Sequence, residues 1–120
     1  MLDPQTVADR YIAVWNETDA KRRRALLAQS WTETAVYADP LMRGRGSDEI
    51  DALIAAVHER FPGFRFAIAG LSDGHGDHVR FSWQLGQEGA EAVVKGTDFV
   101  LIDGDRIAQV TGFLDQVPAV

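Results

Sequence analysis

The spacing of hydrophobic residues changes along the chain, from a helical period in the first half to a strand period in the second. Before Pro62, apolar residues recur every three or four positions, which is typical of helices with one buried face. This spacing predicts helices at residues 4–17, 20–29 and 48–60. The segment between the second and third helices is predicted to be extended, ending in a glycine loop before Ser47, which is expected to cap the third helix.

Apolar and polar residues alternate after Pro62, with a period of two. Alternation of this kind is typical of strands with one buried face. It predicts strands at 64–69 and 78–85, and two further apolar stretches predict strands at 92–102 and 107–114. Asp103-Gly104-Asp105 predicts a tight turn between the last two strands, and SDGHGDH (72–78) predicts a hairpin loop between the first two. Three consecutive hairpins imply an antiparallel meander.

Helices followed by an antiparallel sheet predict an α+β fold, with the helices packed on one face of a curved sheet. The chain has 120 residues, a length that suits a single domain over residues 1–120. Hydrophobic residues make up 46% and charged residues 25%, a balance that favours a globular protein with a core over a disordered one.

The charge balance argues against nucleic acid as a partner. The net charge is −6, whereas binding to a phosphate backbone needs a clustered positive face. The one basic run, Lys21 to Arg24, points in different directions on a helix and is expected to face water. The chain has no cysteine, its first residues lack a signal-peptide pattern, and no stretch approaches the roughly 18 apolar residues of a membrane span. We therefore expect a cytoplasmic protein without membrane or nucleic-acid partners.

Asp98 is the polar residue that fits its surroundings least. It lies in VVKGTDFVLI, and by strand parity it shares a face with Val94, Gly96, Val100 and Ile102. A carboxylate on an apolar face must find a partner, reach solvent or stay protonated, because burying it ionised and alone is very costly. Asp98 is therefore a functional candidate, with two alternatives open: a position at the sheet edge, or a pair with an arginine.

Two further polar residues sit at unusual points. Tyr11 lies on the apolar stripe of the first predicted helix, so its hydroxyl is expected to enter the interior and to need a hydrogen-bond partner, most commonly a backbone carbonyl. Asp39 follows an apolar strand and precedes Pro40; by itself, this pair is ordinary turn chemistry.

His75 and His78 suggest a metal site only superficially. Their glycine and aspartate neighbours are typical of a hairpin loop, and no third ligand has a recognisable spacing. We therefore expect no metal site there.

Three stretches carry a resemblance to a known family: RYIAVW around Tyr11, AVYADP ending at Asp39, and GTDFVLIDGDRI around Asp98. With the helix GSDEIDALI they span nearly the whole chain, and they resemble the nuclear transport factor 2-like superfamily, in its ketosteroid isomerase and SnoaL-like polyketide cyclase branch. The resemblance implies a cone-shaped, cystatin-like roll. It also implies that Asp39 is a general base and that Tyr11 and Asp98 form an oxyanion hole.

Together these features predict an acid–base enzyme that removes a proton next to the carbonyl of a small apolar compound, without a metal or organic cofactor. Both isomerisation and aldol-type cyclisation fit. The alternative is a small-ligand binder or interaction domain of the same fold, without the chemistry.

The remaining expectations concern the pocket and the assembly. A cavity of this kind is the usual small-molecule site. Its walls are expected from Trp15, Trp31, Tyr37, Phe66, Phe81, Trp83, Val100, Val110 and Leu114. Arg43 and Arg45 are expected near its mouth, where they face solvent or attract an acidic substrate. The resemblance and the abundant apolar strand positions also predict a homodimer across the exposed sheet face.

Overall fold

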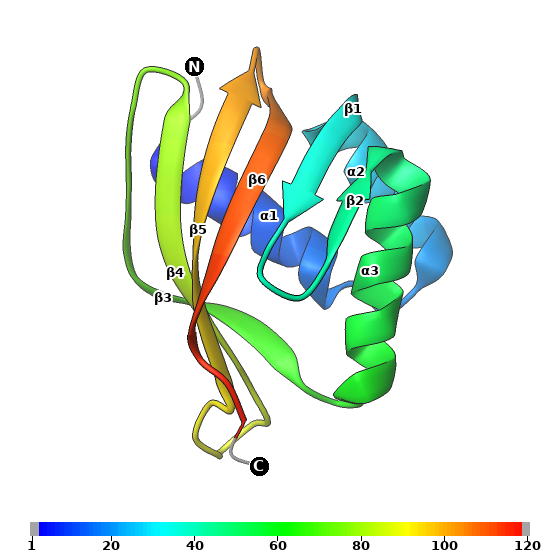
Figure 1. Ribbon diagram of the computed structural model, residues 1–120, viewed down its shortest axis with the longest axis vertical. Helices are drawn as coiled ribbons and strands as arrows, with labels where there is room; N and C mark the ends of the chain where they lie inside the picture. The colour runs from blue at the N-terminus through cyan, green and yellow to red at the C-terminus, as the bar shows by residue number, and fades with distance from the viewer. Residues whose placement is uncertain (1–2, 119–120) are drawn as a thin grey trace.

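A computed structural model describes residues 3–118. It contains three helices, α1 (Pro4–Asn16), α2 (Ala20–Ser30) and α3 (Gly46–Arg60), and none of these described helices is long and apolar enough to cross a membrane. The six strands are β1 (Trp31–Ala38), β2 (Arg43–Arg45), β3 (Arg65–His75), β4 (His78–Gly86), β5 (Val94–Asp103) and β6 (Arg106–Gln116). The predicted α+β fold is confirmed (Figure 1).

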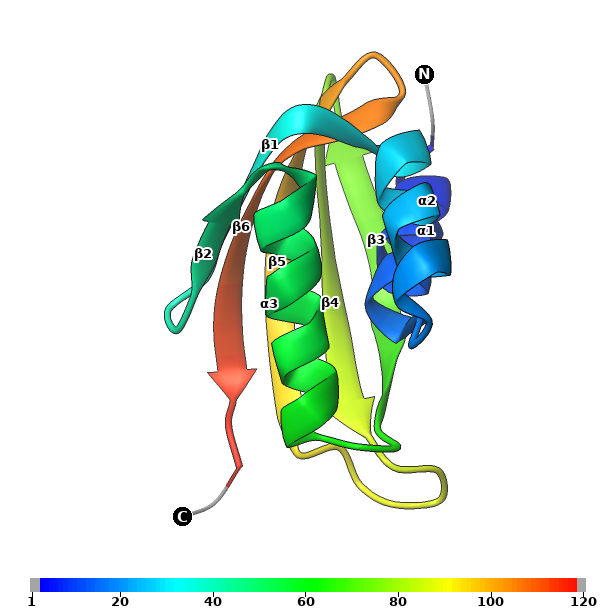
Figure 2. The ribbon, with the colours of Figure 1, turned by 90° about the vertical axis from the view of Figure 1, so that its right-hand side faces the viewer.

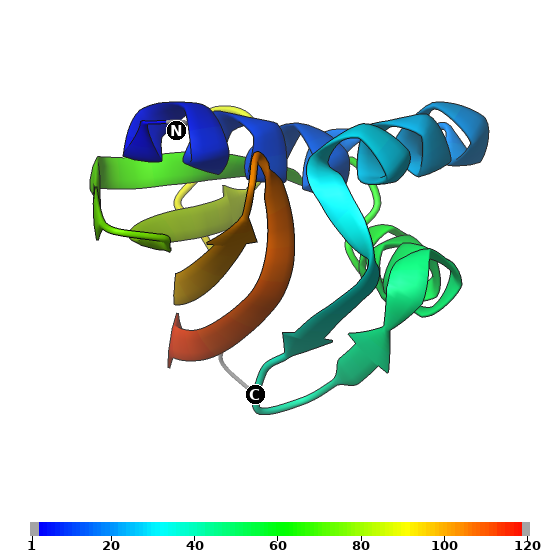
Figure 3. The same cartoon turned by 90° about the horizontal axis from the view of Figure 1, so that it is seen from above.

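The strands form one sheet in the order β2-β1-β6-β5-β4-β3. Strands β3 to β6 make the predicted antiparallel meander, whereas β1 runs parallel to β6 and extends the sheet beyond its last strand. The helices lie together on one side, with α1 against β3, α2 beside α1, α3 and β1, and α3 against β1 and β2 (Figure 2). Seen from above, the sheet curves around the space that the helices close (Figure 3). This arrangement surrounds the core.

Strand alternation sets the composition of that core. On β4, Val79, Phe81, Trp83 and Leu85 are buried, while the residues between them are more exposed. The neighbouring strand leaves room for the largest of them at Gly96, where a Cβ atom would overlap the Trp83 ring. The prediction of half-buried strands from the period of two is therefore confirmed.

Two predicted loops are instead part of the sheet. Gly44 pairs with Tyr37, so the expected glycine loop is the short strand β2. Strand β3 continues to His75 and leaves only a two-residue turn, Gly76 and Asp77, before β4. The strand carries a register shift between Ala69 and Asp73, which interrupts the apolar alternation and so hid the second half of β3 from the sequence pattern.

The start of α3 also differs from the prediction. The N-cap residue is Arg45 rather than Ser47, and its side chain makes no capping hydrogen bond. Instead the Glu49 carboxylate accepts a hydrogen bond from the Arg45 backbone nitrogen at 2.8 Å. Glu49 therefore satisfies the helix start in place of the expected serine.

Arg23 corrects the expectation that the basic run faces water. Only 3% of the Arg23 surface is exposed, and Asp51 of α3 is buried beside it. The Arg23 Nε atom lies 2.6 Å from Asp51 Oδ1, and a second guanidinium nitrogen donates to the Glu17 carbonyl at 2.9 Å. A buried carboxylate needs a cation and hydrogen bonds, and this requirement outweighs the solvation of one arginine.

Candidate active site

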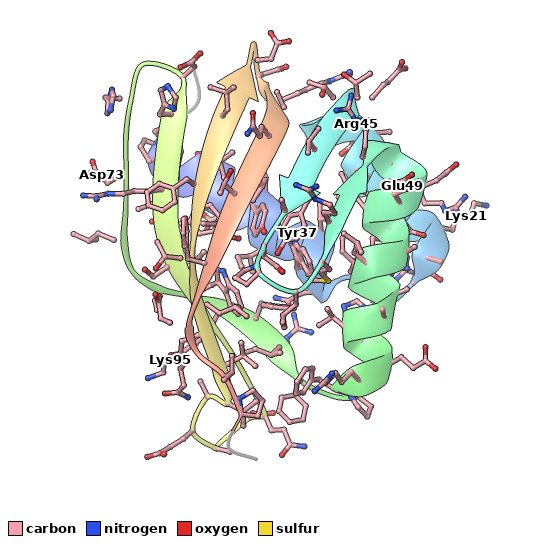
Figure 4. All side chains as sticks on the ribbon, viewed as in Figure 1. Lys21, Tyr37, Arg45, Glu49, Asp73 and Lys95 are labelled. Carbon is pink, nitrogen blue, oxygen red and sulfur yellow. The ribbon has the colours of Figure 1, made fainter. Side chains whose placement is uncertain are left out.

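A cavity of about 660 Å³ lies between α1, α3 and the concave side of the sheet. Five of the predicted wall residues line it: Trp15, Tyr37, Phe66, Trp83 and Leu114. Figure 4 labels Tyr37 near the end of β1, between the sheet and α3. Tyr11 and Asp39 line the same cavity.

Four predicted wall residues lie elsewhere in the core, each at most 2% exposed: Trp31, Phe81, Val100 and Val110. Two of them hold Tyr11 in place. The Trp31 ring stacks on the Tyr11 ring at 5.8 Å between centres, and the Phe81 ring meets it edge-on at 5.0 Å. Strand parity identified the inward face but could not tell which inward residues reach the cavity.

The wall also contains residues that sequence reasoning missed: Leu41, Met42, Ala56, Val57, Arg60, Phe61, Leu85, Val94, Val117 and Pro118. Val57, Leu85 and Val94 carried a signal, since each belongs to an apolar stripe or strand face. No sequence pattern indicated Leu41 and Met42, because they reach the cavity through the path of the loop after Asp39.

Asp98 and Tyr11 form the first polar pair of the site. The Tyr11 hydroxyl donates to Asp98 Oδ2 at 2.5 Å, and the two residues are 3% and 1% exposed. Asp98 lies opposite Phe81 on the inner face, as strand parity predicted, while Arg80 pairs with Asp73 at 3.2 Å. Asp98 does not itself line the cavity, so it reaches a ligand only through Tyr11.

Burial controls the protonation of this pair. Burial raises the pKa of Asp98 to about 6, opposed by the hydrogen bond from Tyr11 and by the Trp83 indole. The Trp83 N–H lies close enough to favour the ionised carboxylate but makes no well-formed hydrogen bond, and Asp98 Oδ1 has no partner among the described residues. The pKa of Tyr11 is raised well above its usual value by burial and then by the Asp98 charge.

Tyr37 and Asp39 form a second, more open pair. The Tyr37 hydroxyl donates to Asp39 Oδ2 at 2.6 Å. The backbone nitrogens of Leu41 and Met42 donate to the other carboxylate oxygen at 2.8 and 2.9 Å. Asp39 therefore caps the turn after β1, as an aspartate before proline often does, and faces the cavity as well. The pKa of Tyr37 is raised by burial first, then by the Asp98 charge and its bond to Asp39.

The two pairs meet at Gly112 of β6. A Cβ atom built there would lie 2.8 Å from Asp98 Oδ1 and 3.3 Å from the Asp39 Cβ atom. Any larger residue at this position would collide with the unpartnered carboxylate oxygen. Because Gly112 has no side chain, the carboxylates of Asp98 and Asp39 can both lie against β6 at this point. No sequence pattern had indicated this role for Gly112.

The arginines near the cavity are not those that the sequence suggested. Arg43 and Arg45 are exposed on β2, and neither lines the cavity. Arg60, the last residue of α3, does line it, and its guanidinium lies 5.7 Å from the centre of the Phe61 ring. It is the only lysine or arginine among the described residues of the wall.

The two histidines of the β3–β4 turn lie together, with ring centres 5.8 Å apart. Neither lines the cavity. Within residues 3–118, no group of three or more histidine, aspartate or glutamate side chains is placed to hold a metal ion.

Comparison with known proteins identifies the fold family. The sequence-family model of the SnoaL-like domain matches residues 8–110. A candidate isomerase of the SnoaL-like family from Agrobacterium tumefaciens is 48% identical, with a TM-score of 0.89 over 93% of this chain and 97% of that one.

Two more distant structures share the fold at 17% identity and a TM-score of 0.70. One is a candidate ketosteroid isomerase from Kribbella flavida, covering 98% of this chain and 81% of that one. The other is a candidate polyketide cyclase from Sinorhizobium meliloti, covering 89% and 93%. No curated protein matches the chain.

Proposed function

The chain belongs to the SnoaL-like family, and from this premise we propose that it is a small-molecule enzyme using acid–base catalysis on an apolar carbonyl compound. The proposed chemistry is proton removal next to the carbonyl, completed either as a ketosteroid isomerase-like proton transfer or as a SnoaL-like cyclisation. The observation that carries the proposal is that Tyr11 and Asp39 line one apolar cavity. No cofactor is needed for this chemistry.

In the proposed reaction, Asp39 is the base. Its ionised carboxylate takes a proton from the carbon next to the carbonyl, and the electrons of the broken C–H bond move onto the carbonyl oxygen. Three hydrogen bonds fix the carboxylate at the cavity wall, so it stays in one orientation. Isomerisation then returns the proton to another carbon, whereas cyclisation joins the enolate carbon to a second carbonyl.

Tyr11 is the proposed proton donor to the enolate oxygen. It carries one hydroxyl proton, which in this structure is directed to Asp98. The donor role therefore requires Asp98 to be protonated and to donate to the Tyr11 oxygen, which frees the Tyr11 proton for the substrate. Asp98 is then a positioning residue that acts through Tyr11.

The test is exchange of the α-protons of 2-tetralone, an apolar bicyclic ketone, in deuterated water, followed by NMR. Enolisation is the step that isomerisation and cyclisation share, so the test does not depend on the natural substrate. The protein is expected to accelerate exchange, and Asp39→Asn is expected to remove about a hundredfold to ten-thousandfold of rate. Exchange that is unchanged in Asp39→Asn would remove Asp39 as the base.

Ligand binding provides the control for that variant. 2-Naphthol, whose oxygen mimics an enolate, is expected to bind Asp39→Asn at least as tightly as the native chain, because the substitution removes a negative charge and leaves the cavity shape unchanged. A variant that neither exchanges nor binds has lost its cavity, and Asp39→Glu then serves as the replacement test of the base.

One observation favours the non-catalytic alternative, a small-ligand binder. The acidic and phenolic groups of the cavity are already hydrogen-bonded inside the protein: Tyr11 to Asp98, and Asp39 to Tyr37 and two backbone nitrogens. For a binder, 2-naphthol would bind but tetralone exchange would equal that of Asp39→Asn. The two measurements together separate the alternatives.

We also propose a homodimer across the outer sheet face. Phe99 and Phe113 are 45% and 52% exposed there, with ring centres 5.7 Å apart. Burying this pair against a second copy would remove apolar surface from water. Sedimentation of the native chain is expected to give a dimer, and the double substitution Phe99→Lys and Phe113→Lys to give a monomer; a native monomer contradicts the proposal.

A further inference from the structure

The polar groups of the cavity are unevenly distributed. Its wall is apolar except for Tyr11, Tyr37 and Asp39 on one side and Arg60 on the other. The first group contains the acid and the two phenols, whereas Arg60 is the one permanent positive charge of the described wall.

The two polar groups lie at different points along α3. Tyr37 pairs with Gly44, which packs against Leu53 in the middle of α3, while Arg60 is the last residue of that helix. The seven residues from Leu53 to Arg60 correspond to about 10 Å along the helix axis. In Figures 1 and 2, α3 starts beside β2 and runs past the turn between β1 and β2. A ligand that contacts both groups must therefore present polar groups at its two ends, about as far apart as the two ends of a bicyclic ring system.

Arg60 is unpaired but held in place. Among the described residues, no carboxylate lies within ion-pair distance of its guanidinium, unlike Arg23, Arg24 and Arg80. The guanidinium instead lies over the ring of Phe61, which also lines the cavity. Contact with an aromatic face orients an arginine while leaving its N–H groups free. Arg60 is exposed to solvent, so the cavity has at its rim an oriented cation whose N–H groups are open to a ligand.

We propose that the ligand of this cavity is an apolar carbonyl compound that carries a carboxylate at the end far from its carbonyl, and that Arg60 binds this carboxylate. The assignment rests on the proposed function for the orientation of the carbonyl toward Tyr11 and Asp39. The guanidinium fork matches the geometry of a carboxylate, and the apolar wall suits a ring system between the two ends.

The experiment compares two probes that differ by one carboxylate. 2-Naphthol and 6-hydroxy-2-naphthoic acid present the same ring system and phenol, and only the second carries a carboxylate at the opposite end. Their dissociation constants are measured by calorimetry with the native chain, with Arg60→Gln, and with Arg43→Gln. Arg43 is a matched control because it is an exposed arginine that does not line the cavity.

The native chain is expected to bind the carboxylated probe about fivefold more tightly than 2-naphthol, since Arg60 is partly solvated. Arg60→Gln is expected to abolish that difference while leaving 2-naphthol affinity unchanged, and Arg43→Gln to change neither. Equal affinity of the two probes for the native chain overturns the inference, as does an Arg43→Gln loss equal to that of Arg60→Gln. Failure of both probes to bind overturns it as well.

These outcomes are separable from the proposed enzyme activity. Tetralone exchange uses a neutral ketone without a carboxylate, so it reports on the catalysis and not on the anion site. Arg43→Gln is expected to leave exchange unchanged, whereas Asp39→Asn removes it. Exchange without carboxylate preference rejects only the anion site, and carboxylate preference without exchange rejects only the catalysis.

Discussion

Two phenol–carboxylate pairs meet at the cavity, alike in bonding and different in the environment of the carboxylate. Tyr11 and Asp98 join at 2.5 Å and are almost completely buried, whereas Tyr37, which is equally buried, joins the half-buried Asp39 at 2.6 Å. Asp98 Oδ1 has no partner in the described part of the chain, but Asp39 Oδ1 accepts two backbone hydrogen bonds. The solvation of the carboxylate, rather than its bond to tyrosine, distinguishes the two pairs.

This difference bears on the proton state of Asp98. A buried carboxylate without further donors favours its neutral form, and with a pKa of about 6 Asp98 is protonated below that pH. In the proposed reaction this is the state that a donor relay requires. Four substitutions or conditions test whether the pairs differ in this way, from the largest expected effect to the smallest.

Tyr11→Phe is expected to have the largest effect. Removing the donor to the enolate oxygen should lower the tetralone exchange rate by about a hundredfold to a thousandfold. The phenyl ring keeps the contacts with Trp31 and Phe81, so the fold should persist, which circular dichroism checks. A rate within about twofold of the native chain would show that the buried pair takes no part in the reaction.

The pH dependence of exchange tests the proton state of Asp98. With a pKa of about 6, Asp98 loses its proton as the pH rises through that value and then accepts the Tyr11 proton. The exchange rate at low substrate concentration is therefore expected to fall about tenfold per pH unit above pH 6. Asp98→Asn donates to Tyr11 at every pH and should remove this alkaline fall; an identical fall in the variant contradicts the relay.

The sequence predicted how two of the three central residues lie. Tyr11 was expected to enter the interior from an apolar stripe, and Asp98 to share a strand face with Val94 and Val100, because helical and strand periods survive boundary errors of a few residues. Asp39 had no such signal, since an aspartate before proline is ordinary turn chemistry. Of the alternatives left open for Asp98, the structure shows a buried partner, Tyr11, 87 residues away along the chain, rather than an arginine or a sheet edge. Their roles in a reaction remain predictions.

The partners of these residues could not be predicted, because they depend on sheet register and loop paths. Tyr37 was expected as a wall residue, and its bond to Asp39 arises from how β1 ends and turns. Gly112 acquires its importance only when β5 and β6 are aligned, with Asp98 opposite it. Arg60 lines the cavity because α3 ends beside it. No local sequence pattern indicates where the end of a helix lies relative to a cavity.

The stability of the fold gives a second measure of Asp98. Its pKa in the folded state, about 6, exceeds its ordinary value of 3.8, so the folded chain binds more protons between these values. The free energy of unfolding should therefore decrease as the pH rises from about 4 to about 6.

Asp98→Asn lacks this titration and isolates its contribution. The free energy of unfolding of the variant minus that of the native chain, from urea melts, should increase by about 2 kcal/mol between pH 4 and pH 7. The other ionisable groups are the same in both chains, so their contributions to the free energy of unfolding cancel in the difference. A difference that is constant with pH would mean that Asp98 titrates alike in the folded and unfolded states.

Tyr37→Phe is expected to have the smallest effect, and it tests the open pair directly. The variant removes one of three hydrogen bonds to Asp39 and keeps the two from the backbone. The carboxylate stays held by the backbone but is less firmly oriented, so the exchange rate should fall by less than about fivefold. A loss as large as that of Tyr11→Phe at every pH would instead give Tyr37 the donor role.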